Sequence, residues 1–293
     1  MRSIETFAVI GGDLRCAYLA GLLAADGYKV ISSGFDSTDL PPCVTGCTNP
    51  AQAISLADCV ILPLPVTLDG TTLNAPFSRM RISLDQVLGG LQPAQYLVGG
   101  AVPDSLRAEV ESRGLQIHDY FRREELAVHN AVPTAEGAIQ LAMEELPITI
   151  AGSRCLITGY GRLGRVLSRL LVALGAQVTV AARNCADRAW ADTQGCTTVD
   201  FAQLNDMGEF DVIFNTVPAL LFDRERLKKL DKGTLLIDLA SRPGGIDFDA
   251  AAELRIKTIW ALSLPGRVAP KTAGAIIRTA ILNMLREAGE WKI

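Results

Sequence analysis

The sequence contains little of what several functional classes require. Only 6% of the 293 residues are aromatic, two are histidines, and the 28 Lys and Arg are outnumbered by the 32 Asp and Glu, which leaves a net charge of −4. The nearest approach to a basic cluster is Arg162, Arg165 and Arg169, which fits the solvent-facing side of one helix. Nucleic-acid binding requires clustered cations, so we expect no nucleic-acid partner.

Long apolar runs and targeting segments are also lacking. No apolar stretch approaches the length of a membrane span. A strand-like segment, residues 6–10, stands close to the first residue, where a signal peptide would otherwise lie. We therefore expect a cytoplasmic protein with no membrane contact.

The cysteines do not form a recognisable framework. The seven are odd in number and scattered along the chain, unlike the cysteines of a disulfide-rich secreted domain. Cys43 and Cys47 resemble half of a metal site, but neither His118 nor His129 has a second ligand at a matching spacing. We expect reduced thiols and no metal.

What the sequence does contain is one pattern that occurs twice. A short apolar run, a glycine turn, an amphipathic helix and a second apolar run follow one another over residues 6–33 and again over residues 154–182. Strands that alternate with helices at this spacing predict parallel sheets covered on both faces. Further buried strands are expected at residues 58–62, 95–99, 212–216, 234–239 and 258–261.

These elements predict an α/β protein of two doubly wound, Rossmann-like parallel-sheet domains with a cleft between them. We assign residues 1–130 to the first domain and residues 131–274 to the second. The junction is placed at residues 130–134, where Pro133 biases Val132 away from helical geometry and Thr134 can cap a helix that runs to about Leu146. The C-terminal segment 275–293 lies on a last helix from about Thr272 to Ala288, which we expect to pack back on the first domain.

The second glycine turn has the Gly-x-Gly-x-x-Gly pattern of a dinucleotide site. Gly159 allows the tight turn, Gly161 lets the backbone approach a pyrophosphate, and Gly164 lets helix pack on strand. Arg162 and Leu163 contribute helix N-terminal amides that face the anion.

The end of the following strand bears on the choice of nucleotide. NAD-binding units usually carry a carboxylate there for the ribose hydroxyl, whereas this chain has Arg183, which can pair with a 2′-phosphate. We therefore expect NADP, with NAD as the alternative. In the first glycine turn Asp13 and Cys16 replace glycines, so Asp13 is either a helix cap or a polar edge of the substrate pocket, and no nucleotide is expected in that domain.

Three further segments follow strands, where sheets of this class bind ligands: residues 215–218, 239–245 and 264–274. Their arginines and lysine predict a rim suited to a small substrate that carries carboxylates. The cofactor-contacting residues that we expect from these segments are Thr216, Val217, Pro218, Ala240, Ser241 and Pro265.

Four segments resemble one family along nearly the whole chain. Residues 8–13 (AVIGGD), 130–137 (NAVPTAEG), 239–245 (LASRPGG) and 264–274 (LPGRVAPKTAG) are similar to those of the A subunit of dipicolinate synthase from spore-forming bacteria. The resemblance implies an NADP-dependent oxidoreductase that takes the cyclic product of dihydrodipicolinate synthase, in the lysine pathway, to pyridine-2,6-dicarboxylate. It further implies that the partner is a flavoprotein-like B subunit, places the chain in the mother-cell cytoplasm during sporulation, and leaves a homo-oligomer open.

Candidate residues for this chemistry follow from charge and position. For two ring carboxylates we choose Arg242 and Lys271 first and Arg15 and Arg123 second. Other candidate substrate contacts are Asp13, Asn130 and Thr134.

Candidate proton-transfer groups are Glu136, Lys271 and His129. Glu136 also suits a helix start, Lys271 a surface cation, and His129 a structural histidine whose hydrogen bonds are satisfied. Two rival functions remain: another NADP-dependent dehydrogenase of the shikimate or 2-hydroxy-acid type, and a nucleotide-binding subunit without turnover.

Overall fold

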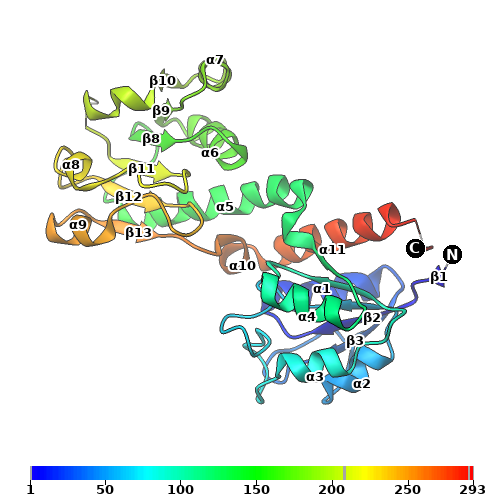
Figure 1. Ribbon diagram of the computed structural model, residues 1–293. Coiled ribbons are helices and arrows are strands. Elements are labelled where there is room, and N and C mark those ends of the chain that lie inside the picture. Colours follow the sequence, from blue (N-terminus) through cyan, green and yellow to red (C-terminus); the bar gives the residue numbers. More distant parts are fainter. Residues whose placement is uncertain (1, 207–208, 290, 293) are drawn as a thin grey trace. The chain divides into compact units, whose positions relative to one another are not determined.

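The structure, a computed structural model, describes residues 2–206, 209–289 and 291–292. The chain divides into two compact units, which are described separately below. Unit 1 comprises Met1–His129 and Ala269–Ile293, and unit 2 comprises Asn130–Val268. Figure 1 shows that each unit has its own sheet with helices around it.

Within its described residues, unit 1 contains a six-stranded parallel sheet in the order β4-β3-β2-β5-β6-β7. A short parallel pair of β1 (Arg2–Ser3) and β14 (Trp291–Lys292) lies outside this sheet. The sheet strands are β2 (Thr6–Ile10), β3 (Lys29–Ser33), β4 (Thr45–Gly46), β5 (Cys59–Ile61), β6 (Tyr96–Gly99) and β7 (Ile117–Asp119). The helices are α1 (Leu14–Ala25), α2 (Pro50–Ser55), α3 (Leu84–Gly89), α4 (Asp104–Ser112), the short η1 (Tyr120–Arg122) and α11 (Pro270–Glu287).

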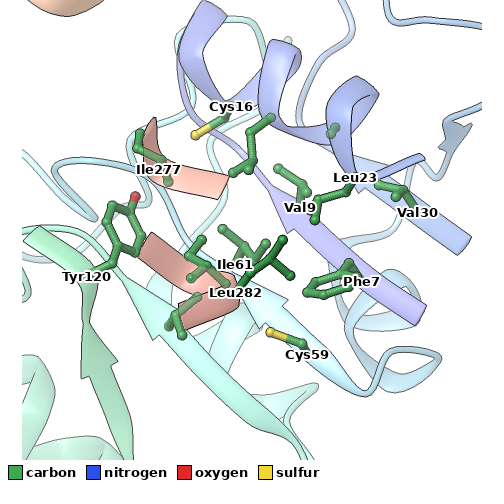
Figure 2. Close-up of a cluster of buried hydrophobic side chains, with 14 of the residues drawn as sticks. Phe7, Val9, Cys16, Leu23, Val30, Cys59, Ile61, Tyr120, Ile277 and Leu282 are labelled. Atoms are coloured by element: carbon green, nitrogen blue, oxygen red, sulfur yellow. The ribbon is translucent and has the colours of Figure 1, made fainter. Parts of the chain in front are cut away.

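Strand β2 shows why this sheet needs cover on both faces, because all five of its residues are buried. Phe7 and Val9 join a core with Leu23 of α1 and Ile277 of α11, as Figure 2 shows. The alternate residues of β2 join a second core with α2, α3 and α4. Successive side chains of a strand point to opposite faces, so β2 contributes to two hydrophobic cores, one on each face of the sheet.

Unit 2 repeats this plan with the order β10-β9-β8-β11-β12-β13, a six-stranded parallel sheet within the described residues. The strands are β8 (Arg154–Thr158), β9 (Gln177–Ala181), β10 (Thr197–Val199), β11 (Val212–Asn215), β12 (Leu235–Asp238) and β13 (Thr258–Trp260). The helices are α5 (Glu124–Glu145, which enters unit 2 at Asn130), α6 (Arg162–Ala173), α7 (Cys185–Asp192), η2 (Phe201–Asp206), α8 (Arg224–Leu227), α9 (Phe248–Glu253) and α10 (Leu264–Val268). The predicted pair of doubly wound α/β domains is confirmed.

The expected helix boundary at residues 130–134 is wrong. Pro133 lies inside α5, which is a continuous helix. Thr134 is not a cap, since its hydroxyl donates to the carbonyl of Asn130 at 2.6 Å. Packing decides against the local preference of the proline: Ala135, Ala138 and Ala142 are fully buried in the core of unit 2 and hold this face of the helix in place.

None of the helices that the structure describes is long and apolar enough to cross a membrane.

Candidate functional site

The glycine turn between β8 and α6 has the geometry of a phosphate cradle. Gly159 adopts φ +93°, which favours glycine, and a β-carbon there would lie 2.5 Å from the hydroxyl of Thr216. A β-carbon on Gly164 would come within 2.2 Å of the carbonyl oxygen of Gly159. At Gly161, the N-cap of α6, nothing lies within 4 Å of that position. The turn is therefore closed beneath and open above the helix amides, as a bound pyrophosphate requires.

A buried polar network supports this turn from below. Thr158, Asn215 and Asp238 are the last residues of β8, β11 and β12, and all three are fully buried. The Thr158 hydroxyl donates to the amide oxygen of Asn215 at 2.6 Å, and the Asn215 amide nitrogen donates to a carboxylate oxygen of Asp238 at 2.8 Å. The carboxyl ends of three neighbouring strands are thus joined by side chains whose polar atoms are satisfied.

The same network holds the loops that follow these strands. Asn215 also donates to the carbonyl of Val217 at 3.0 Å, and the Val217 amide donates back to its side chain at 3.2 Å. Thr216 donates through its hydroxyl to the carbonyl of Thr158 at 2.8 Å. Of the predicted cofactor contacts, Thr216 and Val217 therefore lie directly beside the glycine turn, and Pro218 continues their loop into solvent.

Asp238 fixes the loop that carries the motif of residues 239–245. Its carboxylate accepts from the amide of Ala240 at 3.1 Å and from the amide of Gly245 at 2.7 Å. Ser241 and Arg242 lie at the exposed tip between these two anchors. Sequence reasoning missed Asp238, although a carboxylate that ends the otherwise apolar strand β12 was a usable signal.

Arg183 is placed where the sequence predicts a nucleotide-contacting cation, at the end of β9. It is exposed and has no side-chain partner among the residues that the structure describes. Its loop is held by other residues: Asn184 caps α7 through the amide of Ala186, and Arg188 donates to the carbonyls of Ala182 and Arg183 and to Asp200. The guanidinium of Arg183 is thus free to meet a ligand.

The first turn of α6 presents further polar groups. Arg162 is exposed and Leu163 half-buried at this end of the helix. Arg165 covers the ring of Tyr160, with 5.5 Å from the guanidinium carbon to the ring centroid, and pairs with Asp187 at 3.0 Å. Burial raises the pKa of Tyr160, so its phenol stays protonated. Arg165 therefore joins α6 to α7.

The glycine turn of unit 1 is filled by its own chain. The amide of Gly12 donates to the carbonyl of Asn74 at 2.9 Å. A β-carbon on Gly11 would lie 2.9 Å from Leu73 and 3.0 Å from Ala75. The segment between β5 and α3 therefore covers the backbone that an anion would approach in a dinucleotide-binding turn.

Asp13 and Arg15 of unit 1 neutralise each other and do not form a free cationic site. Asp13 caps α1 and binds the guanidinium of Arg15 at 2.8 Å, while Arg15 also donates to the carbonyl of Leu64 at 2.6 Å. Burial opposes the charged form of Arg15, but the hydrogen bond and charge of Asp13 outweigh it and raise the pKa. Arg15 therefore has a structural role, because its guanidinium links Asp13 to the carbonyl of Leu64.

Arg123 is likewise a paired cation. It binds Glu287 of α11 through both terminal nitrogens, at 2.6 and 2.7 Å, and Glu125 at 2.7 Å. These bonds raise the pKa of Arg123 and lower the pKa values of both carboxyl groups. Two carboxylates offset one guanidinium here, so the free substrate-binding cation that the sequence suggested is not present.

The remaining candidates lie at several places. His129 and Glu136 are exposed on α5, and Lys271 is exposed in the first turn of α11. Glu136 stands at the rim of an apolar groove of about 450 Å³, beside Leu170 and Leu174 at the far end of α6 from the glycine turn.

Two further candidates lie on α5 and α10. The side-chain oxygen of Asn130 is buried and, within the described residues, has no hydrogen-bond partner. Pro265 lies in α10. No group of His, Cys, Asp or Glu within the described part of the chain could hold a metal ion.

Comparisons with known proteins agree with this arrangement. The family model of the N-terminal domain of the dipicolinate synthase A subunit matches residues 6–121. The model of the NAD binding domain of D-isomer specific 2-hydroxyacid dehydrogenases matches residues 123–257. The chain is 32% identical over 285 residues to the dipicolinate synthase A subunit of Bacillus subtilis (strain 168), with 96% of this chain and 95% of that protein covered.

Solved structures give the same result. The dipicolinate synthase A subunit from Bacillus halodurans matches with a TM-score of 0.88 and 30% identity, over 97% of this chain and 98% of that one. A transhydrogenase from Sinorhizobium meliloti, 16% identical, matches with a TM-score of 0.74 over 98% of this chain and 95% of that one and shares the fold. Unit 2 is accordingly a nicotinamide-dinucleotide-binding domain of the dehydrogenase type, which supports an oxidoreductase role. The predicted cofactor class is confirmed, and NADP stays a prediction.

Proposed function

The chain belongs to the family of dipicolinate synthase A subunits, and from this premise we propose that it oxidises the cyclic product of dihydrodipicolinate synthase to pyridine-2,6-dicarboxylate with NADP. The observation that carries the proposal is that unit 2 combines an open phosphate cradle at Gly161 with the exposed cation Arg242, which has no carboxylate partner among the described residues. A dinucleotide and an acidic substrate need these two features.

The nucleotide fits the residues present. Gly159, Gly161 and Gly164, with the amides of Arg162 and Leu163, would receive the pyrophosphate, and Arg183 would pair with the 2′-phosphate. Thr216, Val217, Pro218, Ala240, Ser241 and Pro265 are the proposed further contacts. When bound, the oxidised nicotinamide supplies the capacity to accept a hydride.

The reaction sets two tasks for the protein. Conversion of a dihydropyridine ring to a pyridine removes one hydride and one proton, and a hydroxylated tetrahydro substrate loses water first. Arg242 would bind one ring carboxylate and so help to orient the ring, with Asn130 as a further polar contact from the same unit. For the proton, the exposed unit 1 residues Lys271 and His129 stay the proposed candidates, and Glu136 is not included because it lies at the far end of α6 from the glycine turn.

Membership of the family supports a proposal for the partner and the cellular setting. We propose that the chain works with a flavoprotein-like B subunit in the mother-cell cytoplasm of a sporulating bacterium. Of the cations suggested for the substrate, Arg15 and Arg123 are not included, because each is already paired with carboxylates.

The test is reconstitution from purified components. The chain and the B subunit, together with NADP and freshly made dihydrodipicolinate synthase product, are combined, and both NADPH and the ultraviolet absorption of pyridine-2,6-dicarboxylate are followed. We expect the two products to appear together. Binding of NADP without either product, in the presence of the B subunit, would show a nucleotide-binding protein without turnover.

A further inference from the structure

The loop of residues 239–245 is fastened at both ends to one carboxylate. Asp238 accepts from Ala240 through one oxygen and from Gly245 through the other, at 3.1 and 2.7 Å. Between these anchors the amide of Gly244 donates to the carbonyl of Ser241 at 2.9 Å, which closes a turn. The tip of the loop, with Arg242, is therefore fixed by backbone bonds on both sides.

The space under this loop admits no larger residues. A β-carbon on Gly244 would lie 2.8 Å from the Asp238 carboxylate, and one on Gly245 would lie 2.3 Å from the amide nitrogen of Asn215. Asp238 itself is fully buried and accepts a third bond from Asn215 at 2.8 Å. A buried carboxylate with three donors has little freedom to move, so the loop that it anchors is held in one position.

Trp260, the last residue of β13, supports the tip from one side. Its indole nitrogen donates to the carbonyl of Ala240 at 3.2 Å, and its ring stacks on Phe248 with centroids 5.3 Å apart. The guanidinium carbon of Arg242 lies over the same indole, 5.5 Å from the ring centroid. The indole thus contacts both the loop backbone and the cation that the loop carries.

The guanidinium of Arg242 has no carboxylate partner within the described residues, in contrast to Arg15 and Arg123. No N–H group of this guanidinium donates to a described residue, so these groups are available for an anion. An arginine that is oriented in advance loses less conformational entropy when it binds a planar carboxylate.

We propose that Asp238 and Trp260 are positioning residues, which hold Arg242 for one carboxylate of the substrate. The proposal rests on the proposed function for the identity of that anion. Asp238 acts through the two ends of the loop, and Trp260 acts through the guanidinium that lies over its ring. Neither residue touches the reacting atoms.

The test measures binding of pyridine-2,6-dicarboxylate by titration calorimetry to the whole chain in saturating NADP. We expect Arg242→Gln to raise the dissociation constant of the dicarboxylate at least about tenfold, since it removes a charge-assisted pair. Trp260→Leu should raise the dissociation constant about two- to fivefold. Trp260→Phe should retain most of the affinity, because phenylalanine keeps an aromatic face. NADP binding is expected to stay within about twofold in all three variants.

The double variant separates positioning from general stability. In the Arg242→Gln background, Trp260→Leu should have no further effect on the dicarboxylate, because its action passes through the guanidinium. A folded Asp238→Asn variant should likewise weaken dicarboxylate binding only when Arg242 is present. Arg169→Gln, which removes an exposed arginine of α6, is the matched control and should leave binding unchanged.

Two results would overturn the proposal in different ways. If Trp260→Leu weakens dicarboxylate binding equally with and without Arg242, or leaves it unchanged while Arg242→Gln weakens it, then the positioning role is wrong and the proposed function stands. If the unaltered chain with NADP does not bind the dicarboxylate, or Arg242→Gln has no effect, then the proposed substrate site itself fails.

Discussion

The carbonyl oxygen of Gly159 lies 2.2 Å from the position that a β-carbon of Gly164 would occupy. The first turn of α6 therefore packs on the glycine turn with no room for a methyl group. We expect Gly164→Ala to lower the free energy of unfolding by about 1–3 kcal/mol, since strand and helix must separate. Chemical denaturation measures this loss, and nucleotide binding should fall with it.

Gly161→Ala is the matched control, because open space lies around that position. We expect a change in the free energy of unfolding below about 1 kcal/mol. Nucleotide affinity should still fall at least about tenfold, because the added methyl group occupies the approach of the pyrophosphate. If Gly164→Ala and Gly161→Ala lowered the free energy of unfolding equally, Gly164 would not be more closely packed than Gly161, and the interpretation would be wrong.

Arg183 is exposed and its loop is held by Asn184 and Arg188, so its removal should leave the fold intact. We expect Arg183→Ala to weaken NADP about 10- to 100-fold and NAD hardly at all, since only NADP carries the 2′-phosphate. Arg183→Asp should widen the difference. Titration of both nucleotides measures it, and equal losses for the two would exclude a selective role.

Arg123 joins the start of α5 to α11 through Glu125 and Glu287. We expect Arg123→Ala to lower the melting temperature by a few degrees and to leave the KM of the substrate unchanged, because this cation is already paired. Arg122→Ala is the control: that side chain is 66% exposed, and its carboxylate contacts are longer, at 3.7 and 3.8 Å. A rise in KM for the Arg123 variant at unchanged stability would contradict the structural assignment.

The same cluster predicts a dependence of stability on pH. The folded-state pKa values of Glu125 and Glu287 are lowered by their hydrogen bonds to Arg123. Their contribution to the free energy of unfolding is therefore fully present above the ordinary glutamate pKa of about 4.3. It is lost as the pH falls through their lowered pKa values in the folded protein. Melting curves on the acid side should show this loss, and Arg123→Ala should show less of it.

Thiol reactivity should divide the cysteines by burial. Burial raises the pKa of Cys16 to about 12 and that of Cys155 to about 11, and it raises the pKa of Cys59 as well. Cys43 and Cys185 are exposed. We expect an alkylating reagent at neutral pH to label these two within the native protein and to label Cys16, Cys59 and Cys155 only after unfolding, as mass spectrometry would show. Rapid native labelling of Cys16 would contradict its burial.

The local sequence pattern was sufficient to predict features that consist of a single strand or a single turn. Strands β2, β3 and β8 begin and end at the residues that the sequence predicts, because each has a buried apolar centre and a glycine close to its end. The three glycines of the nucleotide turn could be assigned tasks from their spacing alone. Pro133 shows the limit of such rules, because the buried alanines of α5 outweigh its preference.

Charged residues could not be sorted in the same way. Four cations were candidates for the substrate, two as first choices and two as second, and the sequence does not show which of them are already paired with carboxylates. Arg15 meets Asp13 two residues away, whereas Arg123 meets Glu287 across 164 residues, and only folding reveals the second pairing. The network of Thr158, Asn215 and Asp238 was likewise invisible, because its members lie on three strands that adjoin only in the sheet.

The sequence by itself determined the fold class, the dinucleotide turn and the family. Each depends on residues close together in the chain or on short segments that resemble those of the family. The tertiary structure decided which cations are free and what holds them. Whether a charge is available depends on the groups that surround it in space, and hydrogen bonds between strand ends or helices far apart in sequence set those surroundings. Arg242 and Arg183 are open to a ligand for this reason, and Arg15 and Arg123 are not.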